Sequence, residues 1–131
     1  MNIDFFPTFC ELAGVELSKD RIIDGRSLLH LLRGECKQSP HDYMIYINPH
    51  LLESPGYAAR SRDNFKYLKG TNSENAVYKE TIVHPFLFDL NNDIDESYDV
   101  KMLYHEKYKE LKDYLDNFNE SFNQNPRGWL L

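Results

Sequence analysis

The most regular pattern in the chain lies near its carboxyl end, where large apolar side chains recur every three or four positions. These positions are Tyr104, Tyr108, Leu111, Leu115, Phe118 and Phe122. Because an α-helix turns once every 3.6 residues, this spacing puts all six on one face. The pattern therefore predicts a long helix that lies on a sheet and ends at Asn125-Pro126.

The middle of the chain contains short aromatic and β-branched runs bounded by turn-forming residues, which indicate strands. The pair Asp63-Asn64 separates two of these runs and predicts a hairpin turn. A polar stretch rich in Gly, Asn and Ser, residues 70–80, is expected to form a long loop between strands. The expected strands are residues 43–47, 56–62, 65–68 and 86–90.

Two short helices are expected before the strands. In the first, residues 3–14, Asp4 is placed as the N-cap and Gly14 as the stop. This helix is apolar nearly all round, which predicts burial on more than one side. The second, residues 27–34, offers Ser27 as a cap and ends at a glycine. At the other end of the chain, the apolar tail 129–131 is expected to pack against a neighbour.

A chain of 131 residues has room for one hydrophobic core. Its formal net charge of -6 argues against a nucleic-acid partner, because phosphate binding relies on clustered Lys and Arg. No run is apolar and long enough to cross a bilayer, so no membrane partner is expected. The start lacks the features of a signal peptide, so any export signal of a longer parent would be missing here, and the compartment stays open.

Four stretches, in this order and spacing, carry a resemblance to a known family. The stretches are residues 3–14 (IDFFPTFCELAG), 24–28 (DGRSL), 57–67 (YAARSRDNFKY) and 88–93 (FDLNND). Together they resemble the closing third of the sulfatases, which belong to the alkaline-phosphatase-like superfamily. The resemblance covers nearly the whole chain, and residues 70–80 are its least assignable part.

The resemblance implies an α+β fold. Its core would be an antiparallel sheet of about four strands packed by one long C-terminal helix, preceded by short helices left from a catalytic α/β domain. It divides the chain into residues 1–35, the tail of the catalytic domain, and residues 36–131, the C-terminal sub-domain. The first helix would then pack on a catalytic-domain sheet that this chain lacks. We therefore expect the missing catalytic domain as a partner, or self-association through the uncovered first helix.

Sulfatases use a formylglycine made from Cys or Ser in a C/S-x-P-x-R motif, together with a calcium-type cation. The resemblance implies both for the parent protein and places them upstream of this chain. Neither Cys10 nor Cys36 is followed by the motif, and no serine matches it. The chain alone is therefore predicted to have no catalytic residue, no metal ligand, no cofactor of its own and no activity.

One acidic run, Asp89, Asn91, Asp93 and Asp95, alternates like the start of a calcium loop. Ile94 stands where the loop needs glycine, and Val100 stands where it needs a bidentate glutamate. We therefore interpret the run as an acidic β-turn.

The residues proposed for substrate binding are Arg60, Arg62 and His84. Guanidinium groups suit sulfates and carboxylates, and strand alternation would put Arg60 and Arg62 on one face. Either that face or His84 would line the outer substrate pocket of the parent, although a solvated or salt-bridged strand face remains the simpler reading. His30 is expected at the surface or in packing. The other histidines, His41, His50 and His105, have no acidic or nucleophilic partner at a telling spacing.

The leading hypothesis is a C-terminal fragment of a sulfatase whose parent hydrolyses sulfate esters, with sulfated carbohydrate as the expected substrate. A second hypothesis is a stand-alone module that binds anionic glycans through Arg60, Arg62 and Lys66, against which the overall negative charge argues. A third is a fragment of a phosphonate or phosphate-ester hydrolase of the same superfamily.

Overall fold

The computed structural model describes residues 1–48, 56–70, 84–125 and 127, and these form two compact units. The first unit contains Met1–Asp42 together with Asn125–Leu131, and the second contains Tyr43–Gln124. The predicted division at residue 35 concerns the domains of a longer parent and stays a prediction.

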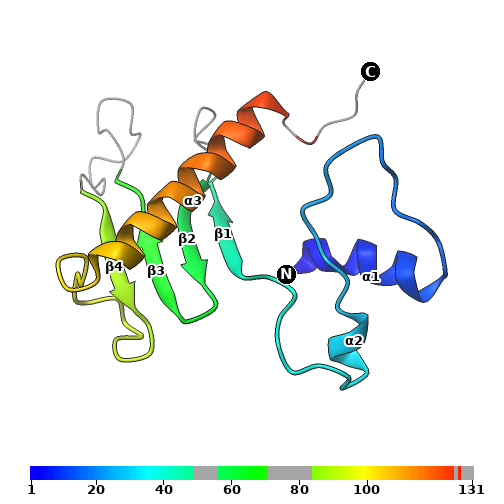
Figure 1. Cartoon of the computed structure of the whole chain (residues 1–131), viewed down its shortest axis with the longest axis horizontal. Helices are drawn as coiled ribbons and strands as arrows, with labels where there is room; N and C mark the ends of the chain where they lie inside the picture. The colour runs from blue at the N-terminus through cyan, green and yellow to red at the C-terminus, as the bar shows by residue number, and fades with distance from the viewer. Residues whose placement is uncertain (49–55, 71–83, 126, 128–131) are drawn as a thin grey trace. The chain divides into compact units, whose positions relative to one another are not determined.

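The second unit is a four-stranded antiparallel sheet in the order β1-β2-β3-β4 (Figure 1). A single long helix, α3 (His105–Gln124), packs on β2 and β3. The predicted antiparallel α+β fold is therefore confirmed. The strands are β1 (Tyr43–Ile47), β2 (Gly56–Ser61), β3 (Phe65–Leu68) and β4 (Phe86–Asp89).

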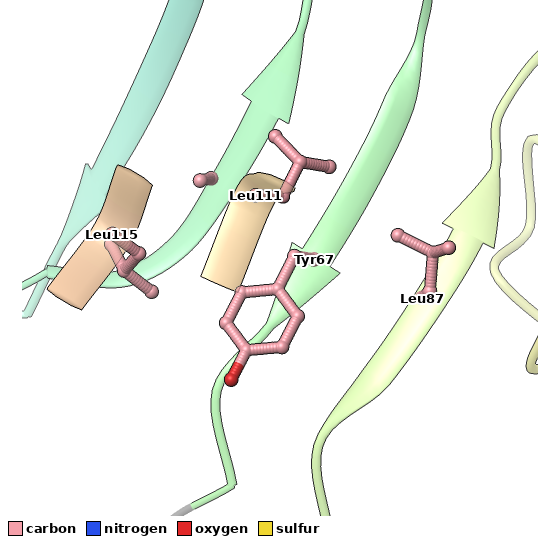
Figure 2. Close-up of a cluster of buried hydrophobic side chains, with 5 residues drawn as sticks. Tyr67, Leu87, Leu111 and Leu115 are labelled. Carbon is pink, nitrogen blue, oxygen red and sulfur yellow. The ribbon is translucent and has the colours of Figure 1, made fainter. Parts of the chain in front are cut away.

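The core of this unit lies between the sheet and α3 (Figure 2). The strand register places Ala59 opposite Tyr67 and Tyr67 opposite Leu87, so the three side chains share a face. From the helix, Leu111 and Leu115 complete the cluster, and both are fully buried. The apolar stripe read from the sequence is thus the face that α3 turns to the sheet, and burial of each leucine contributes about 2 kcal/mol.

The hairpin between β2 and β3 turns at the predicted pair Asp63-Asn64. Asn64 has φ of 67°, a left-handed conformation that asparagine tolerates better than most residues. The Asp63 carboxylate accepts a hydrogen bond from Ser61 and pairs with Lys107 of α3 at 2.9 Å. Burial acts to raise the pKa of Asp63, but its bonds to Ser61 and Lys107 outweigh burial and lower it. The hairpin turn is therefore bonded to α3 through the ion pair of Asp63 and Lys107.

The first unit contains a short 3-10 helix, η1 (Asn2–Asp4), and two α-helices, α1 (Phe5–Leu12) and α2 (Leu29–Leu32). Both α-helices are followed by a glycine of positive φ, Gly14 at 68° and Gly34 at 74°, as predicted. The predicted N-cap position of Asp4 is confirmed, whereas the predicted Ser27 cap is wrong. The side chain of Asp4 makes no capping bond, because its carboxylate is buried and bonded elsewhere. The second helix is shorter than expected, with Leu28 as its N-cap and Ser27 accepting the N–H of Leu29.

Helix α1 packs by one narrow side. Pro7 and Thr8 are buried, whereas the large apolar side chains on the rest of the helix are exposed. The expected burial on more than one side is therefore not provided by the described part of this chain. The exposed residues are Phe5 (53%), Phe6 (57%), Phe9 (63%) and Leu12 (62%).

None of the helices in the described residues combines the length and apolar character needed to cross a membrane. Three sequence predictions lie outside the described residues, because most of the polar stretch 70–80, the apolar tail 129–131 and His50 fall in the undescribed part.

The buried phenol of Tyr67 is expected to make the stability of the second unit depend on pH in the alkaline range. Burial raises the pKa of this phenol, helped by Tyr108 and Asp116. Because the folded pKa exceeds the unfolded value of about 10, its contribution to stability is complete below pH ~10 and is lost as pH rises toward the folded pKa. We expect Tyr67→Phe to flatten the fall in unfolding free energy between pH ~10 and ~12, measured by urea denaturation.

The matched control is Tyr98→Phe, since Tyr98 is 73% exposed and its phenol meets water in both states. This substitution should leave the pH dependence unchanged. Equal slopes for Tyr67→Phe and Tyr98→Phe would show that the Tyr67 phenol is not protected by the fold.

Candidate functional site

Arg60 lies near the end of β2 on the sheet face opposite α3. The register places it between Met44 of β1 and Lys66 of β3. Its Nη2 donates to the amide oxygen of Asn64 at 2.6 Å, and no carboxylate of the described residues pairs with it. Arg60 is half-buried, so its guanidinium is held in place by a neutral partner that does not cancel its charge.

Arg62 lies in the turn, because β2 ends one residue earlier than predicted, at Ser61. Strand alternation therefore does not extend to Arg62, and the argument that it must share a face with Arg60 does not apply. Arg62 is exposed. Its place in a substrate site stays a prediction.

His84 is exposed and precedes β4 by two residues. The register pairs Phe86 with Leu68 and Asp89 with Phe65, so β4 starts at the end of the sheet that is remote from the 62–64 turn. His84 and Arg62 therefore lie at opposite ends of the sheet. A single small ligand could therefore contact either the arginines near the 62–64 turn or His84, but not both. The sheet between them is four residues long, about 13 Å.

Lys66, the third cation of the proposed glycan face, is already paired. Its Nζ lies 2.6 Å and 2.8 Å from the two carboxylate oxygens of Glu96, and it also lies 5.1 Å from the centroid of the Tyr46 ring. A sulfate that bound Lys66 would have to replace this bidentate carboxylate. The cation is therefore poorly available to a ligand.

The acidic run after β4 uses its oxygens to shape the chain. Asp89 accepts from the N–H and the side-chain amide of Asn91 at 3.1 Å, and from the amide of Asn92 at 2.7 Å. The Asn92 bond is the main reason that the pKa of Asp89 is lowered. Asp93 accepts the N–H groups of Ser97 and Tyr98 at 2.8 Å. The bond from the Asn91 N–H to Asp89 makes an Asx turn, whereas Asp93 accepts N–H groups four and five residues further along the chain.

The described residues offer no match to a formylglycine or to a calcium-type cation, the groups that the resemblance leads us to expect in a longer parent. Cys10 is half-buried in α1, Cys36 is exposed, and both are free thiols outside the formylglycine motif. In the described ranges, no group of three or more His, Cys, Asp or Glu side chains is arranged to hold a metal ion.

The histidines have partners that the sequence partly concealed. His30 is exposed and bonds Glu35 at 2.5 Å, which raises its pKa, with a smaller contribution from Glu11. His41, which has no acidic partner at a telling spacing in the sequence, has one in the fold, since its Nε2 lies 2.7 Å from Asp4 Oδ1. The two residues are 37 positions apart, so no spacing signal could reveal the pair. His105 stacks on Tyr108 with ring centroids 6.4 Å apart.

Sequence comparison places this chain among sulfatases, although no family model matches it. It is 49% identical over 51 residues to human steryl-sulfatase, covering 38% of this chain and 9% of the relative. Over 124 residues it is 32% identical to human arylsulfatase D, covering 79% of this chain and 21% of the relative. Its match to the N-acetylglucosamine-6-O-sulfatase of Bacteroides thetaiotaomicron is 31% identical over 134 positions, covering 95% of this chain and 22% of the relative.

Solved structures share the fold. One neighbour, with a TM-score of 0.62 and 29% identity, was solved in complex with its substrate D-glucosamine-2-N,6-O-disulfate, and the match covers 97% of this chain and 25% of that one. A structure described in connection with the metabolism of multiple glycosaminoglycans by Bacteroides thetaiotaomicron matches with a TM-score of 0.69 and 22% identity, over 89% of this chain and 24% of that one.

The chain thus spans about a quarter or less of each relative and neighbour it matches. The matches cover the first unit as well as the sheet and α3, since two of them extend over 95% and 97% of the chain. In sequence and in fold, this chain is a sulfatase C-terminal part.

Proposed function

We propose that the full-length parent of this chain is a sulfatase that hydrolyses sulfate esters of carbohydrates, and that this chain supports its fold and forms part of the substrate-pocket rim. The observation that carries the proposal is the 31% identity to an N-acetylglucosamine-6-O-sulfatase across 95% of the chain. The neighbour whose substrate is a disulfated glucosamine supports the same substrate class.

The reacting groups of this proposed enzyme belong to polypeptide outside the chain. A formylglycine and a calcium-type cation would supply a nucleophile and charge neutralisation there. The described residues contribute other things, namely the packed sheet, the helix that covers it and the cation of Arg60. A rim arginine that meets the sulfate or a neighbouring carboxylate would contribute to binding more than to bond cleavage.

The catalytic part of the parent is the partner we propose for the exposed face of α1, made of Phe5, Phe6, Phe9 and Leu12. Apolar side chains that are more than half exposed gain stability when a second surface covers them. In a chain that lacks this partner, the same face is available to a second copy.

A stand-alone glycan-binding module is less well supported. That reading needs Arg60, Arg62 and Lys66 to act together, yet Lys66 is held by both oxygens of Glu96. The net charge of -6 also disfavours approach of a polyanion.

A chimera tests the proposed function. The corresponding C-terminal part of the Bacteroides N-acetylglucosamine-6-O-sulfatase is replaced with this chain, and hydrolysis of N-acetylglucosamine 6-sulfate is measured. We expect activity from the chimera and none from the chain alone. In the chimera, Arg60→Ala should raise KM about tenfold and change kcat less than about twofold, because a lost charged hydrogen bond costs about 1.5 kcal/mol.

Lys109→Ala is the matched control, since it removes an exposed cation from α3 and should leave both constants unchanged. Hydrolysis by the chain alone that persists through repeated chromatography would contradict the proposal. A folded but inactive chimera would contradict the supporting role, and an unchanged KM for Arg60→Ala would contradict the rim role.

A further inference from the structure

Asp4 is fully buried, and its carboxylate receives donors from three parts of the first unit. Its Oδ1 accepts the N–H of Arg26 at 2.9 Å and faces Nε2 of His41 at 2.7 Å, while its Oδ2 lies 2.8 Å from the amine of Met1. Burial acts to raise the pKa of Asp4, but these hydrogen bonds outweigh it and lower the pKa. The Asp4 side chain is therefore a buried, ionised carboxylate that joins three parts of the first unit by hydrogen bonds.

The same short region is joined to residues 26–28 by a second set of bonds. Thr8 Oγ1 donates to the main-chain oxygen of Asp4 at 2.6 Å and accepts the N–H of Leu28 at 2.9 Å. Thr8 is 3% exposed, so this chain of hydrogen bonds is shielded from water. The start of α1 and the segment 26–28 thus form one bonded base that does not involve His41.

The connector, residues 35–42, leads directly into the first residue of β1. Residues 35–39 are exposed, whereas Pro40 and His41 are partly buried. Arg26 Nη1 donates to the main-chain oxygen of Pro40 at 2.7 Å, and the His41 side chain, 14% exposed, reaches Asp4. The end of the connector is therefore bonded to the base at two neighbouring residues.

We propose that Asp4 and His41 form a latch that holds the connector closed, and that breaking this bond frees the connector while the base stays folded. The base is expected to stay folded because Asp4 keeps its other hydrogen-bond donors. When His41 leaves, the carboxylate still has the Arg26 N–H and the Met1 amine as donors, so it is not stranded without partners. Breaking the latch removes the charge-assisted Asp4–His41 bond from the end of the connector and leaves the bond from Arg26 to Pro40, so the latch controls how freely the chain moves just before β1.

Limited trypsin digestion of the full chain tests the latch, because Lys37 is an exposed cleavage site within the connector. Cleavage of a transiently opened segment follows the population of the open form. We expect His41→Ala to speed cleavage after Lys37 by about tenfold, the factor that corresponds to about 1.4 kcal/mol. Hydrogen exchange of the α1 residues 5–12 should stay within about twofold of wild type, because the base remains bonded.

His105→Ala is the control, because it removes an exposed histidine of the second unit, where it stacks on Tyr108 in α3. It should leave cleavage after Lys37 unchanged. Asp4→Asn and His41→Ala together should act no more strongly than the larger of the two alone, since both remove the same bond. The latch is refuted if His41→Ala leaves cleavage unchanged, or if exchange in α1 rises as much as cleavage does.

Discussion

Replacing Gly25 with alanine is expected to destabilise the first unit by about 3 kcal/mol or more. A Cβ added at Gly25 would lie 2.0 Å from the main-chain oxygen of Ile3 and 2.7 Å from its carbonyl carbon. These are backbone atoms, so no side-chain rotation relieves the overlap. The segment would have to move away from residues 3 and 4, which stretches the bond from the Arg26 N–H to Asp4. Hydrogen exchange of residues 3–12 measures the effect as a loss of protection.

Gly14→Ala and Gly34→Ala are the controls for Gly25→Ala, because they measure the cost of a positive φ without the cost of a steric overlap. Both glycines have positive φ, but a Cβ at either position meets nothing within 4 Å. Alanine there should cost only about 1 kcal/mol, the strain of a left-handed residue. If Gly25→Ala is no more harmful than these two, residues 3 and 25 do not touch in solution and the bonded base described for the latch is wrong.

The parts of the fold that could be predicted are those determined by periodicity and turn chemistry. The stripe containing Leu111 and Leu115 identified the buried face of α3, and the Asp63-Asn64 pair identified the hairpin turn. Within each signal, the residues lie only a few positions apart in the chain, because helix and hairpin geometry are local. The α+β architecture as a whole was implied by the resemblance to sulfatases, with which these local signals agree.

Side chains bonded across long distances in the sequence could not be predicted in the same way. Asp4 has the residue type and position of a helix cap, and a capping bond would satisfy local backbone donors. The fold gives its carboxylate a stronger set of donors from Arg26 and His41, which are 22 and 37 residues away. Lys66 looked available for a ligand for the same reason, since its partner Glu96 is 30 residues further on.

The candidate site was only partly predictable. Residue type identified Arg60 as a cation suited to sulfate, but alternation was extended one residue too far and included Arg62. The strand register, which no local pattern specifies, separates His84 from Arg62. The composition of α1 predicted burial on more than one side, and it was the resemblance to sulfatases, in which this helix packs on a catalytic-domain sheet, that predicted an uncovered face.

Replacing Asn119 with alanine is expected to destabilise the second unit by about 3 kcal/mol. The amide of Asn119 accepts the N–H of Gly56 at 2.8 Å and donates to its main-chain oxygen at 3.0 Å, and Asn119 is 5% exposed. Alanine would leave both backbone groups of Gly56 without these partners, at a cost of about 1–3 kcal/mol each. Urea denaturation followed by the helical circular dichroism of α3 measures the change.

Glu120→Ala supplies the control, because Glu120 is the exposed neighbour on the same helix and its loss should change stability by less than about 0.5 kcal/mol. Asn119-Glu120-Ser121 also fits a glycosylation sequon, but a glycan on this buried amide would break both bonds to Gly56. Chain passed through a secretory pathway should therefore be folded only when Asn119 is unmodified, which mass spectrometry of the soluble fraction detects. Folded chain glycosylated at Asn119, or Asn119→Ala as stable as Glu120→Ala, would mean that the amide does not secure the start of β2 to α3.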